Sequence, residues 1–240
     1  SEAVDTPVLM TSEGFSPLFS MVVPPAMTGE KMVRKESFWA EHLGEQVINP
    51  ALSIRDDGLL EGGMSSGSRD AEGVPRQQRT LVEQGRLCSM LWSTRDAAQQ
   101  VAEGRIEAAA STGSASSGGH QSPPTTGCTE LFLTSTEAPR SMDQLLAHMG
   151  DGYVVNSVMG AHTANPSSGD FSVTTSSILK VENGEIVGSL KQAGLSGNLA
   201  KSLNGAVHLG SDVRRQGSYS SGSMHLPDVL LMDGLRVNPA

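Results

Sequence analysis

The stretch "SILKVENGEIVGSL", residues 177–190, decides the fold, because it places two β-favouring runs on either side of Asn183-Gly184. Asn-Gly is the strongest short hairpin signal, since both central positions of a tight hairpin turn need a positive φ. A second stretch, "QRTLVEQGRLCSML" at 78–91, has the same order of strand, turn and strand. The two stretches share the pattern Val-Glu-[Gln/Asn]-Gly-x-[Leu/Ile]. This is a local similarity and does not establish an internal repeat. The sequence therefore predicts a fold dominated by antiparallel strands.

Other elements are expected on both sides of these hairpins. Further strands are predicted in short β-favouring runs, at 6–10, 46–58 and 229–237. The last run is expected to be a strand pair around Asp233-Gly234. Helices are predicted within 93–110, 141–150 and 197–210. The Ser/Gly/Pro stretch 111–127 has little means of packing and is predicted to be a mobile loop. The predicted class is α+β, predominantly antiparallel, with a few short helices.

A helix is also predicted near the start of the chain, and the stretch "VVPPAMTGE" at 22–30 raises the question of how it ends. Apolar side chains recur at helical spacing from Phe15 to Val23, and Thr11 or Ser12 can cap the first turn. Proline has no backbone donor and clashes with the preceding turn. The helix is therefore predicted to span about 12–23 and to end at Pro24-Pro25.

Composition and charge exclude several classes of protein. With 240 residues and 37% hydrophobic residues, the chain is long and apolar enough to bury a core. Its net charge of -9 argues against a nucleic-acid-binding surface, which needs clustered Lys and Arg. No apolar run approaches the roughly 20 residues of a membrane span, and the first residues do not resemble a signal peptide. A cytoplasmic location without membrane contact is predicted.

The residues alone reveal no active site. No two histidines stand three to five residues apart, which argues against a helical zinc pair; they are His42, His120, His148, His162, His208 and His225. Asp56-Asp57-Gly58 is interpreted as a turn, because the oxygen-rich spacing of a calcium loop is absent. Cys88 and Cys128 are predicted to be two free, buried thiols. No nucleophile elbow of the Gly-x-Ser-x-Gly type stands between a strand and a helix.

The segment "SSGDFSVTTSSILKVENGEIVGSLKQAGLSGNLAKSLNGAVHLGSD", residues 167–212, resembles the C-terminal hallmark of the TldD/PmbA family. Three further segments agree with that family in order and spacing, at 38–58, 68–87 and 221–237. Four ordered blocks make the resemblance specific, and it covers nearly the whole chain from about residue 7. It implies a barrel- or sandwich-like antiparallel domain. We expect residues 1–240 to form a single such domain, with the family's N-terminal domain absent.

The resemblance also bears on metal binding. TldD-type members carry an HExxxH zinc motif on a helix and a cysteine ligand near the C-terminus, whereas PmbA-type members, also called TldE, lack the motif. A gapless alignment on "LGEQV" at 43–47 puts Ser20 and Met21 at the positions of the first His and the Glu, and Pro25 at that of the second His. Ser221 falls at about the position of the cysteine. All four are poor zinc ligands, so the chain resembles the PmbA/TldE branch, with no metal, no other cofactor and no catalytic residue expected.

The leading hypothesis is therefore a non-catalytic PmbA/TldE-like subunit that supports peptide cleavage by a zinc-bearing TldD-like partner. Candidate peptide-binding residues are Met159-Gly160 and Gly197-Asn198, where glycine allows close approach of a peptide backbone. One alternative is a dimeric or larger self-assembly that binds peptides or proteins without a peptidase partner, in line with the family's historical label "modulator of DNA gyrase". Another is a hydrolase that uses Ser220 or Ser221 with His225.

Overall fold

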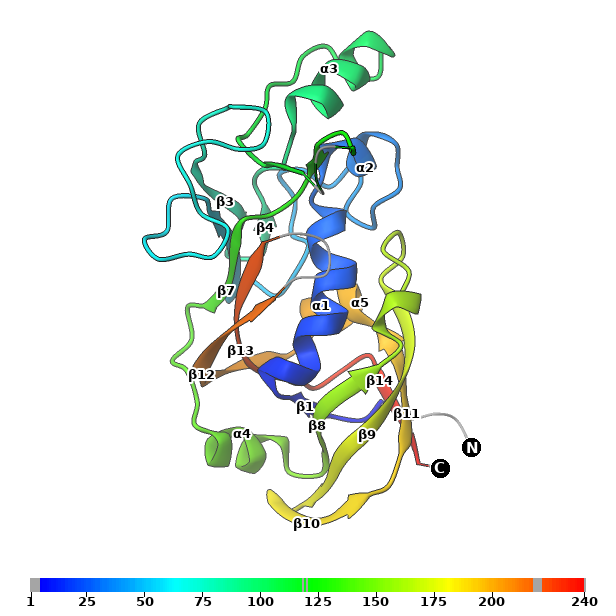
Figure 1. The fold of residues 1–240 in the computed structure, drawn as a ribbon. Helices are drawn as coiled ribbons and strands as arrows, with labels where there is room; N and C mark the ends of the chain where they lie inside the picture. Colours follow the sequence, from blue (N-terminus) through cyan, green and yellow to red (C-terminus); the bar gives the residue numbers. More distant parts are fainter. Residues whose placement is uncertain (1–4, 118, 120, 218–221, 240) are drawn as a thin grey trace.

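The computed structural model describes residues 5–117, 119, 121–217 and 222–239. Helices and strands alternate irregularly along the chain (Figure 1). The helices are α1 (Ser12–Ala26), α2 (Gly29–Val33), α3 (Thr94–Ala102), α4 (Met142–Met149), the short 3₁₀ helix η1 (Ala161–Thr163) and α5 (Leu199–Asn204). None of the described helices is long and apolar enough to cross a membrane.

Twelve strands form one large sheet, and two short strands form a separate ribbon. The strands of the large sheet are β1 (Val8–Met10), β2 (Leu52–Asp57), β3 (Gln78–Glu83), β4 (Arg86–Leu87), β7 (Glu130–Ser135), β8 (Gly152–Met159), β9 (Asp170–Glu182), β10 (Glu185–Leu190), β11 (Ala193–Asn198), β12 (Val207–Gly217), β13 (Ser223–Leu231) and β14 (Leu235–Pro239). The ribbon consists of β5 (Ala115–Ser116) and β6 (Thr125–Thr126).

The large sheet runs in the order β14-β11-β9-β8-β1-β13-β7-β2-β3-β4, with β10 beside β9 and β12 beside β13. Only β1 with β8 and β13 with β7 are parallel pairs among the described strands. The predicted α+β class with mostly antiparallel strands is therefore confirmed. The described strands form an open sheet and do not close into a barrel.

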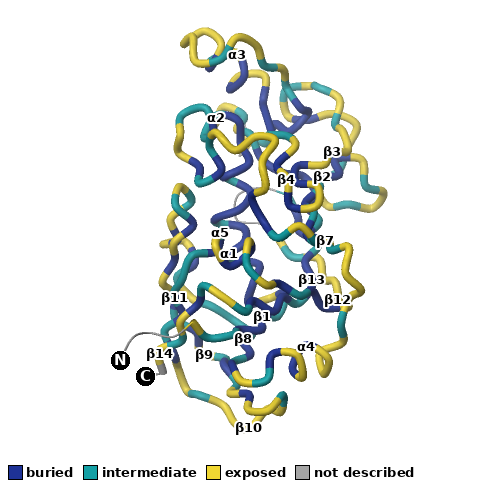
Figure 2. Tube along the Cα trace, turned by 180° about the vertical axis from the view of Figure 1, so that it is seen from behind, coloured by how far each residue is buried: buried dark blue, intermediate teal, exposed yellow. Residues whose placement is uncertain are grey.

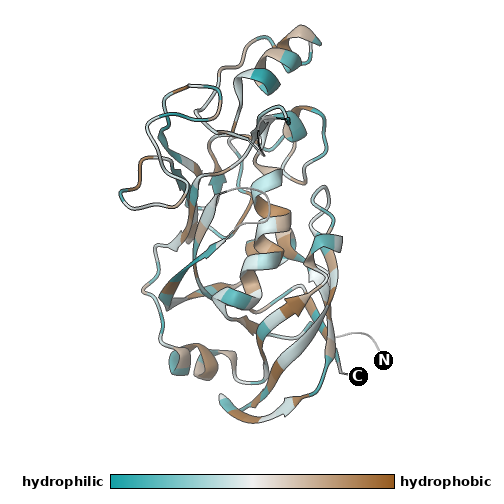
Figure 3. Ribbon diagram, viewed as in Figure 1, coloured by the Kyte–Doolittle hydropathy of each residue, from teal (hydrophilic) through white to brown (hydrophobic). Residues whose placement is uncertain are grey.

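The core lies around β1 and α1, which follow one another in the chain. All three residues of β1 are fully buried, because this strand lies between β8 and β13. Thr11 caps α1 by accepting a hydrogen bond from the backbone N–H of Gly14. Gly14 lies so close to β8 that a Cβ there would stand 2.6 Å from the carbonyl oxygen of Val155. Figure 2 shows α1 as a largely buried helix at the centre of the molecule, and Figure 3 shows hydrophobic segments of this helix alternating with more polar ones.

The predicted end of the first helix is wrong. α1 continues through Pro24 and Pro25 to Ala26, and it also contains Pro17. The burial of Pro24 and of its neighbours Val22, Val23 and Ala26 in the folded chain outweighs the local preference of proline to end a helix. The two missing donors lie in the last turn, where the N–H groups of Met27 and Thr28 bond the carbonyls of Pro24 and Pro25.

Both predicted hairpins are confirmed. Asn183 and Gly184 have φ values of 52° and 80°, and Gln84 and Gly85 have values of 46° and 78°. The 229–237 stretch does contain two strands, but β13 and β14 do not pair with each other. β14 pairs with β11, because β13 already has β1 and β7 on one side and β12 on the other.

Other elements depart from the sequence pattern in length or packing. The predicted helices within 93–110, 141–150 and 197–210 are present as α3, α4 and α5, each shorter than the predicted stretch. Ser141 and Gln144 form a capping box at α4. Within 111–127 the expectation of little packing is wrong, since Ala115 is fully buried and its N–H donates to the Asp70 carboxylate. The sequence analysis did not predict α2, β5, β6, β7, β8, β11 or β12, and the end of the helix expected at 197–210 belongs to β12.

Gly85 offers a test of the hairpin geometry. Its φ is left-handed, and a Cβ would overlap Gln46 and the carbonyl of Ile48. We expect Gly85→Ala to lower the free energy of unfolding by about 3 kcal/mol, from backbone strain plus overpacking. Gly62 has a similar φ of 70° with no atom within 4 Å of the added Cβ, so Gly62→Ala should cost only about 1 kcal/mol. Equal losses in urea unfolding would contradict the steric part of this account.

Candidate functional site

One stripe of α1 faces outward. Every residue of this helix is buried except Glu13, Pro17, Met21 and Pro25, which follow one another at intervals of four. Residues four apart lie on one face of an α-helix. Glu13 is exposed and the other three are partly exposed. We call these four residues the outer stripe; it is apolar apart from Glu13.

The positions that the sequence analysis predicts to align with the family's zinc motif divide between the core and this stripe. Ser20 is fully buried, whereas Met21 and Pro25 belong to the outer stripe. Zinc is bound by thiolate, imidazole or carboxylate groups, and none of these three residues offers one. No group of three or more His, Cys, Asp or Glu residues could hold a metal ion within the described part of the chain. These residues do not fit zinc, and Ser221 lies outside the described residues.

Two recesses lie beside the apolar part of the stripe. The first has a volume of about 310 Å³ and is lined by Pro17, Met21, Val158, Met159, Gly160, Ala161 and His162. The second has a volume of about 330 Å³ and includes Pro24 and Pro25 from α1 together with side chains from α2 and α3. Met159 and Gly160, two of the predicted peptide-binding residues, thus lie next to α1. The side chain of Met159 is 54% exposed.

The other two predicted peptide-binding residues lie elsewhere, at the end of β11. Gly197 stands between two strands, opposite Phe171 of β9 and Leu235 of β14. Asn198 caps α5 by accepting from the N–H of Lys201, and its amide donates to Ser168 and Asp170. Their polar groups are used within the fold, and they do not line the recess that holds Met159 and Gly160.

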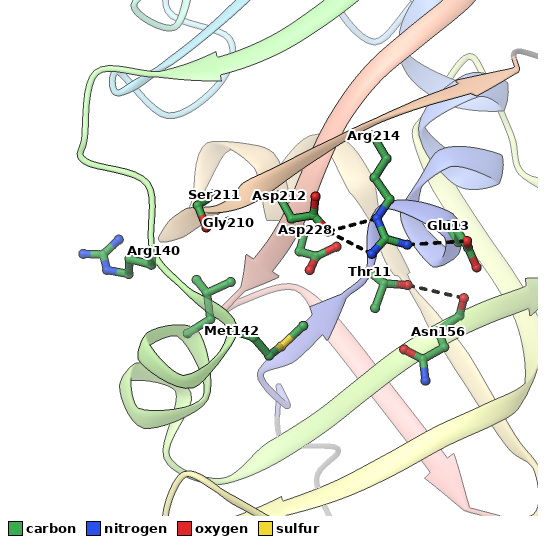
Figure 4. Close-up of a pocket in the computed structure, with 11 residues that line it drawn as sticks. Thr11, Glu13, Arg140, Met142, Asn156, Gly210, Ser211, Asp212, Arg214 and Asp228 are labelled. Atoms are coloured by element: carbon green, nitrogen blue, oxygen red, sulfur yellow. Dashed lines mark hydrogen bonds and ion pairs between the residues drawn. The ribbon is translucent and has the colours of Figure 1, made fainter.

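A charged cleft of about 440 Å³ lies at the N-terminal end of α1 (Figure 4). Glu13, Asp212 and Asp228 bring three carboxylates to it. The Arg214 guanidinium lies 2.8 Å from Asp212 and 3.8 Å from Glu13. Arg140 also lines the cleft, but its guanidinium bonds Glu137 and His208. Three carboxylates around one inward-facing guanidinium favour a cationic group in this cleft.

Asp228 lines this cleft and also forms a hydrogen bond with the first turn of α1. Its Oδ1 accepts a hydrogen bond of 2.8 Å from the backbone N–H of Ser12 in the first turn of α1. Burial raises the pKa of the Asp228 carboxyl, and the negative charges of Asp212 and Glu13 add to the rise. The Ser12 N–H and Arg214 oppose it. The sequence could not indicate this contact, because the two residues stand 216 positions apart.

A buried polar cluster lies at the junction of β2, β7 and β13. The fully buried Glu130 accepts from the N–H of Ser65 and stands 2.9 Å from Nε2 of His225. The His225 ring stacks on Phe132, with centroids 4.1 Å apart. His225 was considered as the base of a hydrolase, but the partner serines of that hypothesis lie outside the described residues. Glu130, which orients this ring, was missed by the sequence analysis.

Asp56 belongs to the same cluster. It lies at the end of β2 and not in a turn, and its Oδ1 accepts from the N–H groups of Thr129 and Glu130. Burial raises the pKa of Asp56 to about 6, against the lowering effect of these two N–H groups and of Arg76. The cysteines differ from the prediction in one respect: Cys128 is buried, but the free thiol of Cys88 is exposed.

Comparison with known proteins places these features in a family. The family described as the PmbA/TldA metallopeptidase C-terminal domain matches residues 3–238. Metalloprotease PmbA of Escherichia coli O157:H7 is 29% identical over 223 residues, which cover 93% of this chain and 45% of that protein. The predicted resemblance is confirmed.

Two solved structures have a fold similar to that of this chain. The crystal structure of TldE from Thermococcus kodakarensis has a TM-score of 0.83 at 23% identity and covers 99% of this chain and 51% of its own, a likeness of fold. A Thermotoga maritima protein described as a candidate modulator of a DNA gyrase has a TM-score of 0.81 at 32% identity, over 99% of this chain and 50% of its own. The chain spans about half the length of these relatives.

The buried Asp56 predicts a pH dependence of stability. Its folded-state pKa of about 6 lies above the ordinary value of 3.8, so the folded protein keeps a proton that the unfolded chain releases. The free energy of unfolding should therefore fall as pH rises from about 4 to about 6. Asp56→Asn can still accept both N–H bonds without burying a charge. We expect it to gain about 1 to 3 kcal/mol at pH 7.

Urea unfolding between about pH 4 and pH 7 checks this prediction, with Glu61→Gln on an exposed loop as the charge-removal control. The pH slope should flatten in Asp56→Asn and persist in the control. A slope that is unchanged in Asp56→Asn, or a variant that is less stable at pH 7, would contradict the assignment.

Proposed function

The chain belongs to the PmbA/TldA metallopeptidase C-terminal domain family, and on that premise we propose that it is a non-catalytic, PmbA/TldE-like subunit. In this proposal it associates with a zinc-bearing TldD-like subunit, and the pair cleaves linear or unfolded peptides. The partner supplies the zinc chemistry, and this chain supplies part of the surface that holds the peptide. The cytoplasmic location and the single domain over 1–240 stay predictions.

One observation carries the proposal: the outward face of α1 presents no histidine or cysteine, and its single carboxylate, Glu13, is too few ligands for a zinc site. The helix lies at the centre of a fold that is similar to that of TldE. Its exposed positions are nevertheless Glu13, Pro17, Met21 and Pro25, and Ser20 is fully buried. A hydrolytic zinc site needs three protein ligands and an open position for water. In this proposal, a peptidase reaction at this helix draws its metal ligands from another subunit.

The hollows along α1 support the part of the proposal that concerns peptides. Glu13 lines the charged cleft, Pro17 and Met21 line the first recess, and Pro25 lines the second. The charged cleft and the two recesses therefore all lie along the outer stripe of α1. Methionine adapts to many apolar shapes, and the carboxylates of the cleft suit the ammonium group or a basic side chain of a peptide. Such a lining would tolerate varied sequences.

Reconstitution with a TldD-like protein from the same cell tests this function. Peptide cleavage should be absent with this chain alone and should rise when the two proteins are mixed. Met21→Glu puts a charge on the outer stripe and should weaken the stimulation about tenfold, the equivalent of about 1.4 kcal/mol. Met64→Glu is the matched control, because Met64 is 75% exposed on a loop outside the three hollows.

Three results would contradict the proposal. The chain could cleave peptides alone, it could fail to associate with the TldD-like protein, or it could leave that protein's cleavage unchanged. Peptide binding by this chain without any peptidase partner would favour the alternative of a self-assembling peptide- or protein-binding module. Circular dichroism of both variants would show that any loss of stimulation is not a loss of fold.

A further inference from the structure

The second recess lies at the C-terminal end of α1 and differs in chemistry from the charged cleft at the other end. α2 and α3 stand beyond this end of the helix, whereas the cleft adjoins its first turn (Figures 1 and 4). Pro24 and Pro25 give the recess an apolar wall, and Lys31 of α2 and Arg95 of α3 bring cationic side chains to it. The two ends of the outer stripe therefore offer different groups to a ligand.

The two cations of the recess are free to bind an anion. Arg95 is exposed and Lys31 is partly exposed, and neither side chain has an ion-pair partner within the described residues. A guanidinium and an ammonium group are good donors to a carboxylate. Two such groups beside an apolar wall suit a carboxylate that is attached to an apolar residue, as at the C-terminal end of a peptide.

The carboxylates that also line the recess are already engaged within the fold. Glu30 stands 3.4 Å from the Arg34 guanidinium, one turn further along the chain. The buried Asp96 accepts a hydrogen bond of 2.6 Å from the Thr126 hydroxyl. The groups of the recess that lack a partner are therefore cationic, whereas those of the cleft are mainly anionic.

The surface between the two ends is apolar and has a defined length. The first recess lies there, with Pro17, Met21 and Met159 in its lining. From Glu13 to Pro25 the helix rises about 18 Å, at about 1.5 Å per residue. An extended peptide covers this distance with about five or six residues, at about 3.3 Å each. A peptide of about six residues can therefore reach from the cleft to the second recess.

We propose that the surface along α1 holds a linear peptide of about six residues by both of its ends, with the ammonium group in the charged cleft and the carboxylate at Lys31 and Arg95. The peptide then runs in the same direction as α1. This inference rests on the part of the proposed function that places a peptide along the outer stripe. It adds the direction of the peptide, its length and the recognition of its chain ends.

Isothermal titration calorimetry with four hexapeptides tests the inference. The peptides share one sequence without charged side chains, and their ends are free, N-acetylated, C-amidated or blocked at both ends. Blocking either end should weaken binding to this chain about fivefold, the effect of losing one partly exposed charge pair. Blocking both ends should weaken it further. Equal affinity for the four peptides, or no binding of any of them, would overturn the inference.

Variants assign each end of the peptide to its hollow. Lys31→Gln/Arg95→Gln should remove the loss caused by amidation and keep the loss caused by acetylation, and Asp212→Asn should do the reverse. Lys191→Gln and Glu61→Gln are the matched controls, because both residues are exposed outside the three hollows, and they should change neither loss. If Asp212→Asn removed the effect of amidation instead, the peptide would run in the opposite direction and the inference would be wrong.

A series of free peptides of about three to ten residues tests the length. Affinity should rise up to about six residues and gain nothing beyond, whereas a rise that continues to the longest peptide would contradict binding by both ends. Cleavage of the same peptides by this chain with a TldD-like protein tests the proposed function separately. Cleavage without any end preference in the titrations would contradict only this inference, and an end preference without cleavage would contradict only the proposed function.

Discussion

The structure depends on the burial of α1. This helix follows directly from the fully buried strand β1, packs against β8, β12 and β13, and leaves only the outer stripe uncovered. Burial of its other side chains removes a large apolar area from water, which is enough to hold three prolines within one helix. The same packing fixes which side chains can reach solvent, and thus which chemistry this part of the fold can perform.

Because of this packing, the chain can have the fold of the family without presenting the ligands of a zinc site on α1. A helix held in this way could present zinc ligands at its exposed positions only, and here those positions hold Pro17, Met21 and Pro25 beyond Glu13. The polar chemistry of the region lies instead at its N-terminal end, where Asp228 bonds the first turn and Arg214 joins the neighbouring carboxylates. The protein therefore offers apolar and acidic surfaces along α1, and in the proposed function these surfaces hold the peptide.

Local signals predicted the local structure well. The turns at Asn183-Gly184 and Gln84-Gly85 could be predicted from the sequence, because a pair of adjacent residues decides whether the backbone adopts a positive φ. The predicted end of α1 was wrong, because the burial of Pro24 in the folded chain outweighs the preference of proline to end a helix. The partner of β14 was also missed, since adjacency in sequence does not decide which edge of a sheet is free. Glu130 and His225 are 95 positions apart and carry no common pattern. The four ordered blocks nevertheless identified the family.

The central claim is that this chain contributes surface and no metal ligands to a peptidase of two unlike subunits. The most direct measurement is the metal content of a purified complex of this chain with a TldD-like protein, with both proteins quantified in the same sample. The account predicts one of each protein and about one zinc per pair, the count for a single catalytic site, with the metal lost when the partner is removed. About two zinc ions per pair, or zinc that stays with this chain alone, would contradict it.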